Sequence, residues 1–315
     1  MNKLRIVFMG TPDFAVATLS TLHQNSYNIV GVVTTPDKPA GRGRKLSESA
    51  VKKYAIDHSL KVLQPKNLKS EDFIKELTLL KPNLIVVVAF RMLPKIVWGM
   101  PKYGTFNLHA SLLPHYRGAA PINWAIINGE TETGATTFFI DDKIDTGEII
   151  LQEKTHIGKE ETAGSLHDRL MVLGAELVLK TVKLIEKNNV STIQQKNILG
   201  LRSANKIHKE TCKIDWNKPL NDIYNHIRGL SPYPTAWTNL INGDESTLLK
   251  IYKASMEIEE HNYKIGALIP SKKELKVATK EGYINLLELQ LPGKRKMEVK
   301  DVLNGLVLSK NAYVL

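Results

Sequence analysis

The residues best suited to chemistry in this sequence stand in the run from Gly104 to Gly118. Asn107 and His109 are two positions apart, so both side chains point to the same face if the run opens as a strand. A neutral amide donor then stands beside an imidazole that titrates near neutral pH. Together they can stabilise a negative oxygen as it develops and transfer a proton.

A carboxylate that can orient the imidazole comes later in the chain. Asp145 lies in a loop of mainly small and polar residues that continues through Thr146 and Gly147. The simpler alternative is that His109 is a hydrogen-bonded core histidine and Asp145 a turn residue. Spacing alone favours this alternative, because such sets of residues are common by chance.

Apolar runs that alternate with helical patterns must position these residues. The alternation predicts an α/β fold in which a doubly wound, mostly parallel sheet is covered on both faces. Ligands of such sheets bind at the carboxyl ends of the strands. A nicotinamide cofactor is rejected, because Gly10-Thr11-Pro12 lacks the three-glycine fingerprint. The expected strands are Leu4–Met9, Ile29–Val33, Leu84–Ala89, Gly134–Ile140 and Ile149–Glu153, and the expected helices are Phe14–His23, Ser49–His58, Ser70–Leu80, Pro121–Asn128 and Thr162–Glu186.

The chain changes character near residue 205. Lys187–Asn205 is polar with few apolar anchors, so we expect a first domain over residues 1–189, a linker over 190–205 and a second domain over 206–315. In the second domain, short alternating segments separated by polar turns indicate a small OB-like β-barrel. Its expected helix is Leu220–Gly229, and its expected strands are Ala236–Ile241, Leu248–Ala254, Lys264–Ile269, Glu274–Ala278 and Tyr283–Leu289.

Composition limits the class of protein. The chain has 315 residues and a formal net charge of +11, which favours a polyanionic partner, although solubility is the simpler explanation. No stretch approaches the ~20 apolar residues of a membrane span, and the first apolar run is too short for a signal-peptide core. Cys212 is the only cysteine, so no intrachain disulfide is expected and the reducing cytoplasm fits. A lone cysteine is more often packed than reactive.

Two charged loops are open to more than one interpretation. Thr34–Ser49 contains prolines and glycines that oppose regular structure, together with Lys38, Arg42, Arg44 and Lys45; composition alone favours a solvated surface loop. Asp141, Asp142 and Asp145 can suggest a divalent cation, but no metal site is predicted, because the rest of the sequence offers no convincing set of ligands.

One motif carries a family resemblance. Asn107-x-His109-x-Ser111-Leu112-Leu113-Pro114, continued by Tyr116-Arg117-Gly118-Ala119-Ala120-Pro121-Ile122, resembles the signature of the folate-dependent formyltransferases. Asp145-Thr146-Gly147, Gly10-Thr11-Pro12-Asp13-Phe14, Lys206-Ile207-x-Lys209-Glu210 and Ile214-Asp215-Trp216 fit the same pattern in order. The resemblance covers nearly the whole chain and is nearest to the members that act on methionyl-tRNA.

The resemblance implies a function for each motif. A Rossmann-like domain transfers the formyl group of 10-formyltetrahydrofolate to the α-amino group of methionyl-initiator tRNA, for translation initiation, and an OB-like domain helps to bind the tRNA. Asn107, His109 and Asp145 are the implied catalytic residues, no metal is needed, and a monomer is expected. Folate contacts are implied for Ser111, Leu112, Leu113, Pro114, Phe90, Arg91, Met92, Leu93, Asp141 and Asp142, and tRNA contacts for Arg42, Arg44, Lys45, Lys38, Lys206 and Lys209.

Other functions remain open. A formyltransferase acting on a sugar-nucleotide or glycinamide-ribonucleotide amine, or a formyl-folate hydrolase, would share the chemistry at the formyl carbon. Only the basic Thr34–Ser49 segment and the basic second domain argue for tRNA over a small acceptor. A non-catalytic RNA-binding protein is the alternative from a different class, and Asn107, His109 and Asp145 together argue against it.

Overall fold

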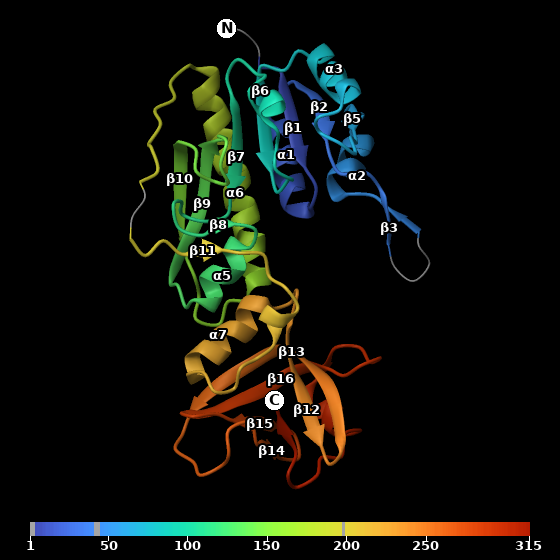
Figure 1. Cartoon of the computed structure of the whole chain (residues 1–315), viewed down its shortest axis with the longest axis vertical. Coiled ribbons are helices and arrows are strands. Elements are labelled where there is room, and N and C mark those ends of the chain that lie inside the picture. The colour runs from blue at the N-terminus through green and yellow to red at the C-terminus, as the bar shows by residue number, and fades with distance from the viewer. Residues whose placement is uncertain (1–3, 41–44, 197–198) are drawn as a thin grey trace. The chain divides into compact units, whose positions relative to one another are not determined.

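The chain folds into two compact units, each described here by itself. The computed structural model describes residues 4–40, 45–196 and 199–315. The first unit comprises Met1–Gly118, Thr133–Thr155 and His167–Ser203, and the second comprises Ala119–Glu132, His156–Leu166 and Ala204–Leu315 (Figure 1). Two inner segments therefore join the C-terminal residues, an arrangement that boundaries drawn along the chain cannot express. The boundaries at 189, 190–205 and 206 stay a prediction.

A seven-stranded sheet forms the centre of the first unit. Its strand order is β10-β9-β7-β6-β1-β2-β5. The pairs β1–β2, β1–β6, β2–β5 and β6–β7 are parallel and β7–β9 is antiparallel, which confirms the predicted mostly parallel, doubly wound sheet. The strands are β1 Ile6–Gly10, β2 Ile29–Val33, β5 Val62–Leu63, β6 Leu84–Val88, β7 Thr105–His109, β9 Glu132–Phe139 and β10 Ile149–His156.

Helices flank this sheet in Figure 1. The helices of the first unit are α1 Asp13–Gln24, α2 Ala50–Asp57, α3 Glu71–Leu79, α4 Lys95–Trp98 and most of α6 Ala163–Glu186, whereas α5 Pro121–Ile127 belongs to the second unit. The expected helices are present, and the short α4 was not expected. Among the described residues, no helix is both long and apolar enough to cross a membrane.

Close packing of α6 on β7 decides which way the candidate site faces. A Cβ added at Gly174 of α6 would lie 2.8 Å from Leu108 Cδ2, so the side chain of Leu108 points to α6. Side chains alternate along a strand, so Asn107 and His109 point to the other face of the sheet. On that face Val87 pairs with Asn107, and Val87 belongs to a buried cluster with Met9, Leu93 and Val97 among others.

The basic segment Thr34–Ser49 has more regular structure than expected. Its arms form strands β3 Lys38–Ala40 and β4 Lys45–Ser47, which pair antiparallel, so the prediction of an irregular loop was wrong for the arms. Pro39 lies within β3 and does not prevent pairing. In an isolated two-stranded ribbon each strand has one edge without a partner, where a missing N–H removes no hydrogen bond. At the base of the segment, Lys52 forms ion pairs with Asp37 at 2.5 Å and Glu48 at 2.7 Å.

The second unit contains an antiparallel sheet of order β14-β15-β16-β13-β12-β18, with β17 on β16. A bridge between Ala267 and Tyr313 brings the two ends together and nearly closes the predicted barrel. Expected strands are present as β12–β16, whereas β17 and β18 were missed because each spans only two residues. The elements from residue 204 on are η1 Glu210–Cys212, α7 Leu220–Leu230, β12 Ala236–Asn242, β13 Glu245–Ile258, β14 Leu268–Pro270, β15 Leu275–Ala278, β16 Gly282–Gln290, β17 Met297–Glu298, α8 Val299–Leu303 and β18 Tyr313–Val314. Outside both large sheets, β8 Arg117–Gly118 and β11 Ser203–Ala204 form a separate two-stranded sheet.

Candidate active site

His109 ends strand β7 and is almost fully buried, with 6% of its surface exposed. Its Nε2 lies 2.8 Å from the carbonyl oxygen of Tyr116. A carbonyl oxygen only accepts hydrogen bonds, so this contact requires a hydrogen on Nε2. The other ring nitrogen, Nδ1, faces Asp145 Oδ2 at 3.7 Å, which is ion-pair range but longer than a hydrogen bond. The structure therefore brings together the imidazole and carboxylate that the sequence singled out.

The backbone holds the Asp145 carboxylate in place. Asp145 has φ +55°, a left-handed conformation that Asp tolerates better than most residues. Its Oδ2 accepts a hydrogen bond of 2.9 Å from the Gly118 N–H. Two residues on, a Cβ at Gly147 would lie 1.7 Å from the Phe139 carbonyl oxygen, so only glycine fits there. The loop is thus pressed against the end of β9 with the carboxylate turned toward His109.

Asn107 is half-buried in the middle of β7. Its strand partners are Val87 on β6 and Phe138 on β9. By strand alternation its side chain shares the face of His109, as the spacing predicts. Asn107 and His109 therefore share one face of β7, and the Asp145 carboxylate lies beside His109.

The turn from Ser111 to Pro114 is held by hydrogen bonds from within the protein. Ser111 is fully buried and its hydroxyl donates to the His115 carbonyl at 2.8 Å. The Thr136 hydroxyl donates to the Ser111 carbonyl at 2.6 Å and accepts from the Leu113 N–H at 3.2 Å. Leu113 is buried with Phe138 and Ile149, whereas Leu112 and Pro114 are half-buried. These hydrogen bonds fix the backbone of the turn that follows His109.

The segment that follows β6 contains four more candidate folate residues. Arg91 donates to the carbonyls of Pro65 and Lys66, the latter at 2.9 Å, and burial lowers the pKa of its guanidinium below its ordinary value. Leu93 is buried in the core, Phe90 is half-buried and Met92 is 66% exposed. These four candidate folate residues therefore differ in role, since Arg91 and Leu93 hold the segment while Met92 faces solvent.

The acidic loop before Asp145 is ordered by Asp141. Its carboxylate accepts from the Thr146 hydroxyl at 2.7 Å and from the Lys143 N–H at 3.0 Å. Asp142 forms an ion pair with Lys95 of α4 at 3.9 Å, which links the loop to the segment after β6. Nowhere in the described ranges does a group of three His, Cys, Asp or Glu side chains stand ready to hold a metal ion.

The candidate tRNA-binding residues are more scattered. Arg42 and Arg44 lie outside the described residues, and only the backbone of Lys45 is described. Lys38, Lys206 and Lys209 are exposed. The ammonium of Lys209 lies 5.7 Å from the centre of the Trp237 ring, within cation–π range.

The sequence analysis missed three groups that hold His109 and the Asp145 loop: the Tyr116 carbonyl, the Gly118 N–H and the side chain of Gln195, which donates to the Asp145 and Gly147 carbonyls. The Tyr116 carbonyl and the Gly118 N–H act through the main chain, which every residue carries, so side-chain type gives no signal. Gly118 has φ +125°, and a glycine in a motif can signal such a conformation. Gln195 gave no signal at all, since it stands in a polar stretch without a motif.

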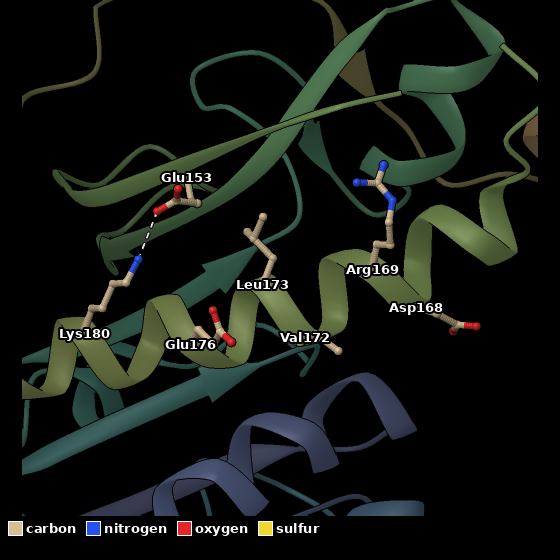
Figure 2. Close-up of a pocket in the computed structure, with 7 residues that line it drawn as sticks. All are labelled: Glu153, Asp168, Arg169, Val172, Leu173, Glu176 and Lys180. Atoms are coloured by element: carbon tan, nitrogen blue, oxygen red, sulfur yellow. Dashed lines mark hydrogen bonds and ion pairs between the residues drawn. The ribbon is translucent and has the colours of Figure 1, made fainter. Parts of the chain in front are cut away.

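A surface hollow lies elsewhere on the first unit. Figure 2 shows that it is formed mainly by side chains of α6, with Glu153 of β10 and Lys180 joined across it at 3.2 Å. Its volume is about 580 Å³. None of the predicted site residues lines it: the lining residues are Glu153, Asp168, Arg169, Val172, Leu173, Glu176 and Lys180.

Known proteins resemble the chain along its whole length. Residues 4–182 match the family model described as formyl transferase, and residues 206–307 match formyl transferase, C-terminal domain. A methionyl-tRNA formyltransferase of Flavobacterium johnsoniae is 59% identical and covers 100% of both chains. One of Bacteroides thetaiotaomicron is 52% identical, over 98% of this chain and 97% of its own.

Solved structures share the fold at lower identity. The sugar 3N-formyl transferase WlaRD, crystallised in the presence of dTDP and 5-N-formyl-THF, has a TM-score of 0.64 and 21% identity over 94% of this chain and 100% of its own. HypX from Aquifex aeolicus in complex with tetrahydrofolic acid has a TM-score of 0.64 and 17% identity over 96% of this chain and 47% of its own. Because both family models match and relatives more than half identical span the chain, it belongs to the methionyl-tRNA formyltransferase family of formyl transferases.

Proposed function

We propose that the protein is an enzyme that transfers the formyl group of 10-formyltetrahydrofolate to the α-amino group of methionyl-initiator tRNA. The observation that carries this proposal is the 59% identity to a methionyl-tRNA formyltransferase over the full length of both chains. The proximity of His109 and Asp145, with Asn107 on the same face of the sheet, supports catalysis over passive RNA binding. We further propose that the enzyme acts in the cytoplasm as a monomer.

The proposed reaction begins with attack of the neutral amine nitrogen on the formyl carbon. The carbon becomes tetrahedral and its oxygen gains negative charge. Asn107 donates a hydrogen bond to that oxygen, and His109 does so once the formyl oxygen replaces the Tyr116 carbonyl at its Nε2–H. Both donors act most strongly because the charge develops only in the transition state. The carbon–nitrogen bond to the folate then breaks, the folate nitrogen takes up a proton, and the former amine loses its surplus proton.

Asp145 is proposed to support His109 rather than to touch the formyl group. Its carboxylate faces Nδ1 while the Tyr116 carbonyl holds Nε2, so the ring has contacts on both sides. These contacts hold the ring before the substrates bind, and the Asp145 carboxylate continues to hold it when the formyl oxygen replaces the Tyr116 carbonyl. The carboxylate also assists proton movement from the amine through water.

The folate is proposed to bind beside this centre. Ser111–Pro114 form one wall, the segment Phe90–Leu93 a second, and Asp141 and Asp142 the outer edge. Two observations support this assignment. Hydrogen bonds of the Ser111 hydroxyl and the Leu113 N–H hold the first wall in place, and the exposed Met92 side chain is free to contact a ligand. For the tRNA, Arg42 is the foremost candidate, with Arg44, Lys45, Lys38, Lys206 and Lys209 as neutralisers of phosphate charge.

The acceptor can be tested directly with the purified protein. It is mixed with 10-formyltetrahydrofolate and, separately, methionyl-initiator tRNA, methionyl-elongator tRNA or an amino-sugar nucleotide, and the formylated product is identified by mass. We expect formyl-methionyl ester from initiator tRNA at the highest rate. Formylation of the amino sugar alone, or release of formate without an acceptor, would reject the proposal.

The basic segment is tested by one variant. Arg42→Ala should lower kcat/KM for the tRNA and reduce the slope of log binding against log salt by about one. Binding of the folate should stay unchanged. An unaltered salt slope would remove Arg42 from the tRNA contacts.

A further inference from the structure

Gln195 connects the two segments that hold the candidate catalytic residues. Its Nε2 donates to the Asp145 carbonyl at 3.0 Å and to the Gly147 carbonyl at 2.8 Å. Its Oε1 accepts from Arg117 Nε at 3.1 Å and from a terminal nitrogen of the same guanidinium at 2.7 Å. Carbonyls only accept and a guanidinium only donates, so the orientation of the amide is fixed by its partners. Both hydrogens and both lone pairs of this side chain are used.

The segment around Gln195 is itself anchored to the same loop. Ile193 pairs with Ile149 as an isolated antiparallel bridge, with both backbone hydrogen bonds at 2.8 Å. The Thr192 hydroxyl donates to the Glu148 carboxylate at 2.6 Å. The sequence indicated few apolar residues that could pack Lys187–Asn205 against the rest of the chain, but residues 192–195 are hydrogen-bonded to the start of β10. These bonds give Gln195 a defined position.

The partners of Gln195 flank the atoms that hold His109. Arg117 lies between Tyr116, whose carbonyl binds Nε2, and Gly118, whose N–H binds Asp145 Oδ2. Asp145 contributes its main chain to Gln195 and its side chain to Gly118. These contacts form a closed hydrogen-bonded ring. Gln195 binds Arg117, the next residue Gly118 donates to the Asp145 carboxylate, and the Asp145 carbonyl accepts from Gln195.

We propose that Gln195 is a positioning residue for formyl transfer, which acts by fixing the Asp145 loop against the Tyr116–Gly118 segment. The proposal rests on the proposed function, because it assigns Gln195 an effect through Asp145 on the same reaction. Without the amide, the Asp145 and Gly147 carbonyls lose their donor and Arg117 loses its acceptor. The carboxylate then loses its set distance from Gly118 and His109, and small displacements of catalytic groups reduce rates strongly.

The chain offers a matched control in the neighbouring Gln194, which is exposed. Gln195→Met keeps the length of the side chain but removes all four hydrogen bonds. Gln195→Glu keeps an acceptor for Arg117 but removes both donors to the carbonyls. We expect both variants to lower kcat about tenfold and to change KM for folate and tRNA less than about twofold. Gln194→Ala should match the wild type.

A double-mutant cycle separates positioning from a general loss of fold. In an Asp145→Asn background, Gln195→Met should change kcat less than about twofold, because the group through which it acts is already altered. Equal tenfold losses in both backgrounds would overturn the proposal, and so would a Gln195→Met enzyme with the kcat of the wild type. A similar loss in Gln194→Ala would also overturn it.

A readout without catalysis keeps this inference distinct from the proposed function. Hydrogen exchange at the Gly118 amide, which donates to Asp145, should be faster in Gln195→Met than in the wild type and unchanged in Gln194→Ala. If the wild type does not formylate methionyl-tRNA, the proposed function fails while this comparison still decides the role of Gln195. If the Gly118 amide exchanges its hydrogen as slowly in Gln195→Met as in the wild type, Gln195 does not fix the Asp145 loop against Gly118 and the proposal is contradicted.

Discussion

Acid should destabilise the second unit through one buried histidine. His226 lies on α7, and its Nε2 has no hydrogen-bond partner within the described part of the chain. Burial lowers the pKa of His226 from its ordinary value of 6.5 to about 4; a hydrogen bond with the backbone of Cys212 opposes this shift, and the charge of Lys218 adds to it. The folded state therefore keeps the ring neutral at pH values where the unfolded chain binds a proton.

The sign and size of the effect follow from that difference. Between pH 6.5 and 4 the unfolded state binds more protons, so the free energy of unfolding falls as the pH falls through this window. A pKa difference of one is worth about 1.4 kcal/mol, so the difference between 6.5 and about 4 is worth about 3 kcal/mol when complete. At pH 5 about 2 kcal/mol should already be lost. Above pH 7 the contribution is constant.

The assay is urea unfolding at pH 7, 6 and 5, followed by tryptophan fluorescence, to which Trp216, buried in the core of the second unit, contributes. His226→Gln keeps a polar N–H but cannot titrate, so its loss of stability between pH 7 and 5 should be about 2 kcal/mol smaller than that of the wild type. His208→Gln, which changes an exposed histidine of the same unit, should behave as the wild type. The same dependence on pH in wild type and His226→Gln would refute the reasoning.

Two further changes test packing. Arg228→Met should lower the free energy of unfolding by about 3 kcal/mol, because the buried guanidinium donates to Asn225 Oδ1 at 2.8 Å and to the Glu161 carbonyl at 2.9 Å; a loss below 1 kcal/mol in urea unfolding would argue against this role. Leu113→Ala should cost about 3 kcal/mol by leaving a cavity against Phe138 and Ile149, and a thermal midpoint equal to that of the wild type would show that the cluster does not need it.

Local patterns predicted the sheet because its central strands are unambiguous. β1 and β6 are buried along their whole length, and their continuous apolar runs have no competing interpretation in a chain of helical and turn segments. The short strands β17 and β18 could not be found this way, since two residues carry no period. Assignment of Ala119–Glu132 and His156–Leu166 to the second unit depends on packing between distant segments, which no local pattern contains.

The candidate site was predictable in part for a different reason. Strand alternation placed Asn107 and His109 on one face, but spacing alone gave no cause to join them to Asp145, and the family resemblance supplied that link. Gln195 was missed because its partners include main-chain carbonyls, which any sequence offers. Left-handed φ at Asp145 and the contact that only Gly147 allows can be explained after the fold is known but not before.

The central claim is that His109 and Asn107 stabilise the oxygen that becomes negative during transfer. Single-turnover formylation of methionyl-initiator tRNA by His109→Ala and Asn107→Ala, at saturating folate, measures this most directly. We expect each variant to react on the order of 100-fold more slowly, a loss of about 3 kcal/mol, with folate binding largely retained. Rates within about twofold of the wild type in both variants would contradict the account.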